Sequence, residues 1–273
     1  MSYRSILVNI DIDGPVAPIV MAAIDLAQRH GARLIGHCAA DTPLPMPLPE
    51  GGSLFTSTWQ QLREGIETRL EEVHVGFERL TSGSVKTEWR QHLRNPTHAV
   101  VEASRSADLI VMAASDGAAT GDNYRFADPA GVVVRAGRPV LATGDQFERI
   151  RAEKIIVAWK DTREARRAVA DAVPLLAAAK EVTVATVATE ADQWLRDGLN
   201  DTTAFLAAHG IKAESKLIES PDEYIELFNF IDASGADLVV SGAYGHSRLR
   251  EWAFGGVTRS LLNETRLSRF MSS

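Results

Sequence analysis

Residues 236–256 read ADLVVSGAYGHSRLREWAFGG and combine a predicted strand with a glycine-rich segment. The stretch begins with a continuous apolar run, which is typical of a strand buried on both faces of a parallel sheet. Glycines follow at positions 242, 245, 255 and 256. Because glycine is costly inside regular structure, this cluster indicates either a special backbone geometry or the close approach of a ligand.

The same apolar motif occurs earlier in the chain. ADLIVMAA at 107–114 is similar to ADLVVSGA at 236–243, and SILVNID at 5–11 is similar to KIIVAWK at 154–160. Two pairs of similar segments in the same order predict a duplicated domain. The connecting stretch GDQFERIRAE separates the copies.

We therefore predict one domain over residues 1–146 and a second over residues 152–273. In each, continuous apolar strands alternate with segments of helical periodicity, which indicates a parallel sheet with helices on both faces. The predicted fold class is α/β, with two tandem doubly wound domains.

Three local patterns predict where particular elements lie. Asn95-Pro96 predicts a helix start, because asparagine is a good N-cap and proline is well tolerated at the first helical position. Ser220 and Glu223 have the spacing of a capping box, which predicts a helix beginning there. The last predicted strand, LSRFM at 267–271, carries Arg269 where an apolar residue is expected, so we predict that it pairs weakly.

Composition limits the classes of function. The 273-residue chain has a formal net charge of −7, which argues against general nucleic-acid binding. Its single cysteine, Cys38, excludes an intramolecular disulfide or a multi-cysteine metal site. The sequence shows neither an apolar run of membrane-spanning length nor a signal-peptide pattern, so we expect a cytoplasmic protein that does not bind membranes.

The glycine stretch predicts an anion site. In open parallel sheets, ligands bind beyond the carboxyl ends of the strands, where Gly242 is expected. The segment VTRSLLNE after Gly256 has a helical pattern, and a helix N-terminus offers free backbone N–H groups to a phosphate. Arg248 and Arg250 would add positive charge. The alternative is that the glycines only shape a connection and the arginines are solvated.

Here the chain resembles the universal stress protein family. Gly242, Gly245 and Gly255 have the G-x2-G-x9-G spacing of that family's nucleotide-binding signature. The stretches VAWKDTREARRAV, DPAGVVVRAGRPVL and GAYGHSRLREWAFGGVTRSLL are similar to tandem bacterial members.

The resemblance implies a five-stranded parallel sheet in each domain, of the adenine nucleotide alpha-hydrolase-like type. It also implies ATP or another adenine nucleotide in the cleft, and pairing of two domains. Carried onto this chain, it implies that the nucleotide-binding residues are Ala158, Lys160, Val187, Gly242, Ala243, Gly245, His246, Arg248, Gly255, Gly256, Val257 and Thr258.

Neither copy follows the family pattern completely. The second copy has Gly256 where the family usually has serine or threonine, and Lys160 where it often has aspartate. Lys160 would reach a phosphate or form a salt bridge with a neighbouring acid. The first copy has the aspartate, Asp11, which makes it a weaker candidate site. Its glycine motif, however, is replaced by a segment whose aspartates would repel phosphates: Asp116, Asp122 and Asp128.

We therefore expect a stress-response regulator that binds the nucleotide mainly in its second domain and acts on an unidentified protein partner. We expect the two domains to pair within the chain, and two chains could form a homodimer. One alternative is a slow ATPase using Mg²⁺, although we identify no catalytic residue. The other is a dimerising scaffold that has lost nucleotide binding. The histidines show no metal-binding spacing, so we predict no metal site in the protein itself.

Overall fold

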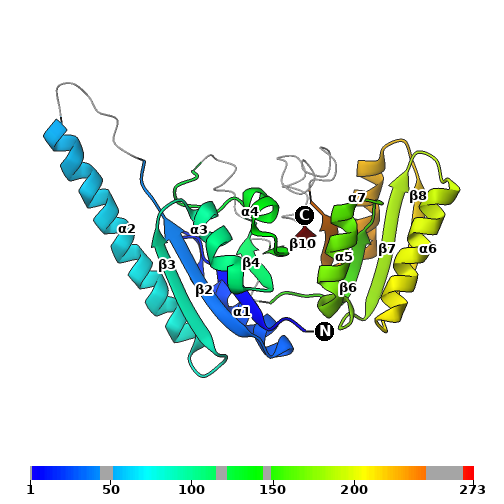
Figure 1. Ribbon diagram of the computed structural model, residues 1–273, viewed down its shortest axis with the longest axis horizontal. Coiled ribbons are helices and arrows are strands. Elements are labelled where there is room, and N and C mark those ends of the chain that lie inside the picture. Colours follow the sequence, from blue (N-terminus) through cyan, green and yellow to red (C-terminus); the bar gives the residue numbers. More distant parts are fainter. Residues whose placement is uncertain (1, 44–51, 115–121, 144–148, 244–266) are drawn as a thin grey trace. The chain divides into compact units, whose positions relative to one another are not determined.

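The computed structural model describes residues 2–43, 52–114, 122–143, 149–243 and 267–273. Side chains are described for these residues except at positions 52–56 and 224. The chain forms two compact units (Figure 1). The first unit contains mainly residues 3–136, and the second contains mainly residues 137–145 and 150–273.

The first unit is a parallel sheet with helices. Its strands lie in the order β3-β2-β1-β4, and β1 is paired with β2 on one side and β4 on the other. Helices α1 and α2 pack against one another. The elements are β1 (Ser5–Asn9), α1 (Val16–His30), β2 (Arg33–Ala40), α2 (Gly52–Thr81), β3 (Thr87–Leu93), α3 (Pro96–Ala103), the 3-10 helix η1 (Ser104–Ser106), β4 (Leu109–Ala113) and α4 (Pro129–Ala136).

The second unit has five parallel strands in the order β10-β9-β6-β7-β8, and β5 pairs antiparallel with β10. The elements are β5 (Val140–Thr143), β6 (Lys154–Ala158), α5 (Arg163–Leu176), β7 (Glu181–Ala188), α6 (Gln193–Ala208), β8 (Glu214–Glu219), α7 (Glu223–Ser234), β9 (Leu238–Gly242) and β10 (Ser268–Ser272). The predicted α/β class is confirmed.

The prediction of a weak last strand is wrong. All five residues of β10 are buried, and the strand is paired on both sides, with β9 and with β5. Arg269 itself is buried. Its environment is set by two strands distant in sequence, which local hydropathy does not report.

Both predicted helix starts are confirmed, but only one of the two predicted caps is present. Asn95 caps α3 as predicted, because its side chain accepts a hydrogen bond from the His98 N–H at 3.1 Å. The capping box is wrong. Asp222 occupies the N-cap position of α7, Glu223 is the first helical residue, and the Ser220 hydroxyl accepts a bond from the Asp222 N–H.

An aspartate at the start of each repeated motif joins two neighbouring strands. In the first unit, the Asp108 carboxylate accepts hydrogen bonds from the N–H groups of Arg4 and Ser5 at 2.7 and 3.0 Å. In the second unit, Asp237 accepts from the N–H groups of Glu153 and Lys154 at 3.1 Å each. The duplicated motif ADL therefore has the same structural role in both copies.

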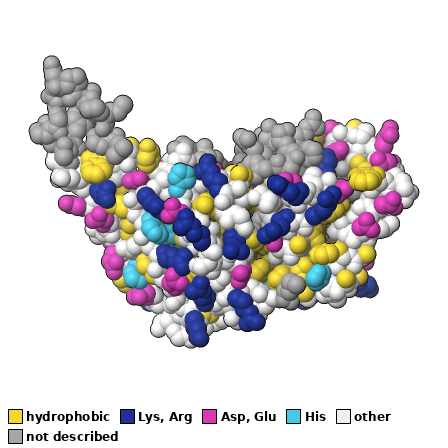
Figure 2. Space-filling view, in the orientation of Figure 1, with side chains coloured by type: hydrophobic (Ala, Val, Ile, Leu, Met, Phe, Trp, Pro, Cys, Tyr) yellow, Lys and Arg dark blue, Asp and Glu magenta, His cyan; other side chains and the backbone are white. Residues whose placement is uncertain are grey.

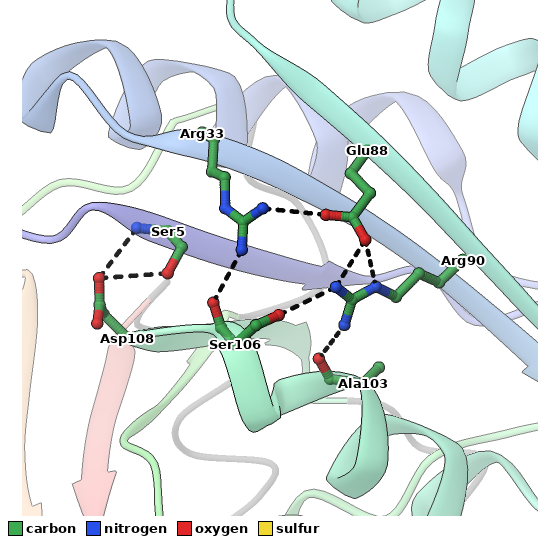
Figure 3. A network of polar contacts seen from close by, with 7 residues as sticks. All are labelled: Ser5, Arg33, Glu88, Arg90, Ala103, Ser106 and Asp108. Atoms are coloured by element: carbon green, nitrogen blue, oxygen red, sulfur yellow. Dashed lines mark hydrogen bonds and ion pairs between the residues drawn. The ribbon is translucent and has the colours of Figure 1, made fainter.

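Charged side chains extend this junction in the first unit (Figure 3). Arg33 on β2 contacts the Glu88 carboxylate on β3 at 3.1 Å and donates to the Ser106 carbonyl at 3.2 Å. Arg90 donates to the Ala103 carbonyl at 2.6 Å and to the Ser106 hydroxyl at 3.0 Å. The network ties β2 and β3 to the turn that leads into β4.

We expect Asp108→Ala to lower the free energy of unfolding of the first unit by about 2 kcal/mol, because it leaves two backbone N–H groups without their acceptor. Asp108→Asn keeps an acceptor oxygen and should cost less than half as much. The free energy of unfolding of both variants can be measured in urea, with hydrogen exchange of β1 as the probe of the first unit. Equal losses in the two variants would contradict the assigned role.

Candidate functional site

The carboxyl ends of the parallel strands in the second unit bring several predicted site residues together. Ala158 ends β6 and lies in register with Ala185 of β7 and Ser241 of β9. Val187 and Gly242 follow those partners toward the same edge of the sheet. The predicted positions in three neighbouring strands therefore share one edge, where ligands bind in open parallel sheets.

Only part of the predicted site lies within the described residues. Ala243 follows β9 directly, is buried, and donates its N–H to the Ser272 carbonyl at 2.8 Å. The remaining glycine-motif positions lie outside the described residues: Gly245, His246, Arg248, Gly255, Gly256, Val257 and Thr258.

Gly242 lies directly against the first turn of α5. A Cβ atom added at Gly242 would lie 2.5 Å from the backbone nitrogen of Ala165 and 2.7 Å from the carbonyl carbon of Glu164. Real Cβ atoms essentially never approach so closely, and backbone atoms cannot rotate away. Packing of α5 against β9 therefore requires glycine at this position, whether or not a ligand binds.

Lys160 forms a salt bridge, which was one of the two roles that the sequence left open for it. Its ammonium lies 2.9 Å from the Glu223 carboxylate at the start of α7. Both side chains are about two-fifths exposed, at 43% and 41%. An ion pair this exposed contributes at most about 1 kcal/mol, so Lys160 remains available to another anion at little cost.

The corresponding edge of the first unit is occupied by its own carboxylates. Asp128 caps α4, because its carboxylate accepts hydrogen bonds from the N–H groups of Ala130 and Gly131 at 3.1 and 3.0 Å. Asp13 forms a salt bridge with Arg125, which holds the pKa of the Asp13 carboxyl below its usual range. An internal anion thus occupies the N-terminus of α4, where a phosphate would be expected to bind.

Asp11 belongs to a buried chain of hydrogen bonds. Its Oδ1 accepts from the Asn9 side-chain amide at 3.1 Å and from the Ala127 N–H at 3.2 Å. Asn9 in turn accepts at Oδ1 from Nδ1 of the His37 ring, 3.0 Å away. Burial raises the pKa of Asp11 to about 7 and lowers that of His37 to about 3. His37 is therefore neutral at physiological pH.

Sequence reasoning did not single out Asn9 and His37. The available signal was weak: each is a polar residue inside an apolar strand pattern, SILVN and RLIGHCAA. Such residues usually indicate a buried hydrogen-bonded network, because an unpaired buried polar group is costly. Cys38 is buried beside them, and burial raises the pKa of its thiol, so it behaves as a small apolar residue.

The described part of the chain lacks two further features. Within it, no three histidine, cysteine, aspartate or glutamate side chains are placed to share a metal ion. No helix among the described residues is long and apolar enough to cross a membrane.

No family model matches this chain, and no curated protein matches it. Solved structures do. A universal stress protein from Archaeoglobus fulgidus is 14% identical, with a TM-score of 0.69, and the match covers 98% of this chain and 96% of that one. The cytoplasmic domain of a prokaryotic cation chloride cotransporter is 12% identical, with a TM-score of 0.54 and coverage of 98% and 95%.

These two similarities extend over almost the whole chain at low sequence identity, and one of them is to a domain of a transport protein. They therefore establish the architecture and leave the activity open. The chain has the fold of the universal stress proteins.

Proposed function

We propose that this protein is a tandem universal stress protein that binds ATP or a related adenine nucleotide at the carboxyl edge of the second unit's sheet. The binding residues would be Ala158, Lys160, Val187, Gly242 and Ala243, together with the glycine-motif positions that follow. Nucleotide occupancy would alter the surface that the protein presents to a partner.

One observation carries the choice of the second unit: the first unit already holds carboxylates where an anion would bind. The Asp128 carboxylate accepts hydrogen bonds from the N–H groups at the start of α4. A phosphate at this position would have to displace the Asp128 carboxylate. In the second unit, Lys160 offers an ammonium at the sheet edge instead. Since opening its exposed pair with Glu223 costs at most about 1 kcal/mol, Lys160 can attract an anionic ligand in the second unit.

Two features favour the scaffold alternative. Gly242 is required by the packing of α5, and Lys160 has an internal partner in Glu223. Both residues thus have roles that need no nucleotide. Slow ATP hydrolysis with Mg²⁺ is supported less well, because none of the described residues stands out as a base for an attacking water.

The test is to denature the purified full-length protein and identify any released nucleotide by chromatography. Calorimetric titration with ATP, ADP, AMP and cyclic AMP, with and without Mg²⁺, follows on nucleotide-free protein. We expect close to one adenine nucleotide per chain. The double variant Gly245→Val/Gly255→Val should lose it, because valine would crowd the phosphate-binding backbone. Gly242 is unsuitable for this test, since its substitution would disturb α5.

Asp11→Asn in the first unit serves as the matched control and should leave the nucleotide content unchanged. Lys160→Met should weaken binding about three- to ten-fold, through the loss of one ammonium near the phosphates. Absence of released nucleotide together with no heat on addition of Mg²⁺-ATP would refute the proposal and favour the scaffold.

A further inference from the structure

The second unit contains a cavity of about 500 Å³ between α5 and α6. We call it the α5–α6 pocket. Its volume falls within the range of small-molecule binding sites, roughly 300–1,000 Å³. It lies on the face of the sheet that carries α5 and α6, and none of the described residues assigned to the nucleotide lines it.

Three aromatic side chains line the α5–α6 pocket: Trp159, Trp194 and Phe205. Trp159 is buried, whereas Trp194 is 69% exposed and Phe205 is 40% exposed. Hydrophobic side chains among charged ones are visible on the face of this unit seen in Figure 2. Large aromatic residues exposed around a cavity are typical of a binding surface, because their burial by a ligand is favourable.

The indole N–H of Trp159 is a hydrogen-bond donor without an acceptor among the described residues. Trp159 is only 8% exposed, and it lines the pocket. A Cβ atom built at Gly198 on α6 would lie 3.7 Å from this nitrogen, and Gly198 also lines the pocket. This N–H is therefore available to an acceptor on a ligand in the pocket.

The charged groups around the pocket are mostly negative. Three aspartates line it, Asp161, Asp197 and Asp201, against one arginine, Arg166. Arg166 is already paired with Asp161, at 2.5 Å and 3.0 Å. Asp197 accepts a hydrogen bond from the amide of Gln193 at 2.8 Å. The Asp201 carboxylate has no partner in the described part of the chain, so the pocket has a net negative charge and one free carboxylate.

We propose that the α5–α6 pocket binds a small organic cation with an aromatic body and a hydrogen-bond acceptor. The aromatic body would pack on Trp194 and Phe205. The cationic group would pair with Asp201 and gain a cation–π contribution from the exposed ring of Trp194. The acceptor would receive a hydrogen bond from the indole N–H of Trp159. This assignment does not depend on nucleotide binding.

Isothermal titration of the full-length chain with three matched compounds tests the proposal. Tyramine carries the ammonium, the ring and a phenolic acceptor. Phenethylamine lacks the acceptor, and 3-(4-hydroxyphenyl)propionate replaces the cation with an anion. We expect tyramine to bind at least ten-fold more tightly than the propionate and about three- to ten-fold more tightly than phenethylamine.

Three variants assign the contacts. Asp201→Asn should weaken tyramine about three- to ten-fold and leave the propionate no weaker. Trp159→Phe should weaken tyramine to the level of phenethylamine without changing phenethylamine itself. Gly198→Leu should fill the pocket and abolish binding of all three compounds. Leucine is a better helix former than glycine, so α6 should persist, as circular dichroism would verify. Glu190→Gln changes an exposed acid that does not line the pocket and is the charge control.

Three results would overturn the proposal. The first is equal affinity for tyramine and the propionate, and the second is unchanged binding in Gly198→Leu. The third is the absence of heat when tyramine is added up to about 10 mM, a concentration at which even weak binding is detected. A fourth would be a dimer in sedimentation that dissociates in Trp194→Ser, because a second copy would then cover the pocket. The Gly245→Val/Gly255→Val variant should bind tyramine normally, which separates this site from the proposed nucleotide site.

Discussion

In the Gly242→Val variant, we expect the second unit to lose about 3 kcal/mol or more of stability, while the first unit unfolds as in the wild type. The added Cβ would lie 2.5 Å from the backbone nitrogen of Ala165. To remove this steric clash, the first turn of α5 would have to move away from β9. That turn is held by its N-cap, since the Thr162 hydroxyl accepts a bond from the Ala165 N–H at 3.2 Å.

Hydrogen exchange measured by mass spectrometry distinguishes the two units. Protection should fall in the peptides that cover α5 and β9, and it should be retained in those that cover β1 and β2. Gly198→Ala is the control within the same unit, because its Cβ would have no neighbour closer than 3.7 Å. That variant should be slightly stabilised, since alanine favours helix. Full protection of β9 in Gly242→Val would show that α5 does not constrain this position.

The second large effect concerns pH and Asp11. Its pKa is about 7 in the folded protein, against an ordinary value of 3.8. The folded state therefore holds a proton that the unfolded chain has released. This contribution is fully present below about pH 4 and is lost as the pH rises through about 7. Taken alone, Asp11 should lower the stability of the first unit as the pH rises over this range, whereas His37, whose pKa is lowered, acts in the opposite sense. Comparing a variant at Asp11 with the wild type isolates the Asp11 contribution.

Asp11→Asn removes this titration and keeps the shape of the side chain. Its Oδ1 can still accept from Asn9 and Ala127. The stability of the variant relative to the wild type should rise by about 2–3 kcal/mol as the pH is raised from 5 to 8. Each unit of pKa shift corresponds to about 1.4 kcal/mol. Urea unfolding at several pH values, with hydrogen exchange of β1 as the probe, measures the difference between the two proteins.

Asp13→Asn provides a control of opposite sign. Arg125 lowers the pKa of Asp13, so the stability from this pair is present above the ordinary pKa and is lost as the pH falls through the lowered one. Asp13→Asn should therefore cost stability at pH 8 and less at low pH. Parallel pH profiles for Asp11→Asn and the wild type would mean that Asp11 ionises normally despite its burial.

The sequence predicts the elements that have strong local patterns. The apolar runs in SILVNID, KIIVAWK and ADLVVSGA form β1, β6 and β9. The strand β3 (Thr87–Leu93) is harder to place from the sequence. Most of β3 is only half-buried, so its hydropathy pattern is weak and its boundaries were hard to predict.

The candidate site was predicted in part. The sequence indicated which copy carries the glycine motif, and the structure brings Ala158, Val187 and Gly242 to one edge of the sheet. The sequence did not indicate that Asp128 caps α4 or that Glu223 pairs with Lys160. The α5–α6 pocket was also beyond prediction, because Trp159 follows β6 whereas Trp194 and Phe205 lie on α6.

The amino-acid sequence alone was enough for the α/β class and for the position of the glycine motif, and it predicted the duplication. These properties depend on local periodicity and on similarity between segments, which can be read along the chain. Only the tertiary structure decided that Arg269 is buried in a strand paired on both sides, and that Gly242 is needed by a helix. The physical reason is that burial, pKa and steric contact depend on neighbours brought together by folding, and those neighbours lie far away in the sequence.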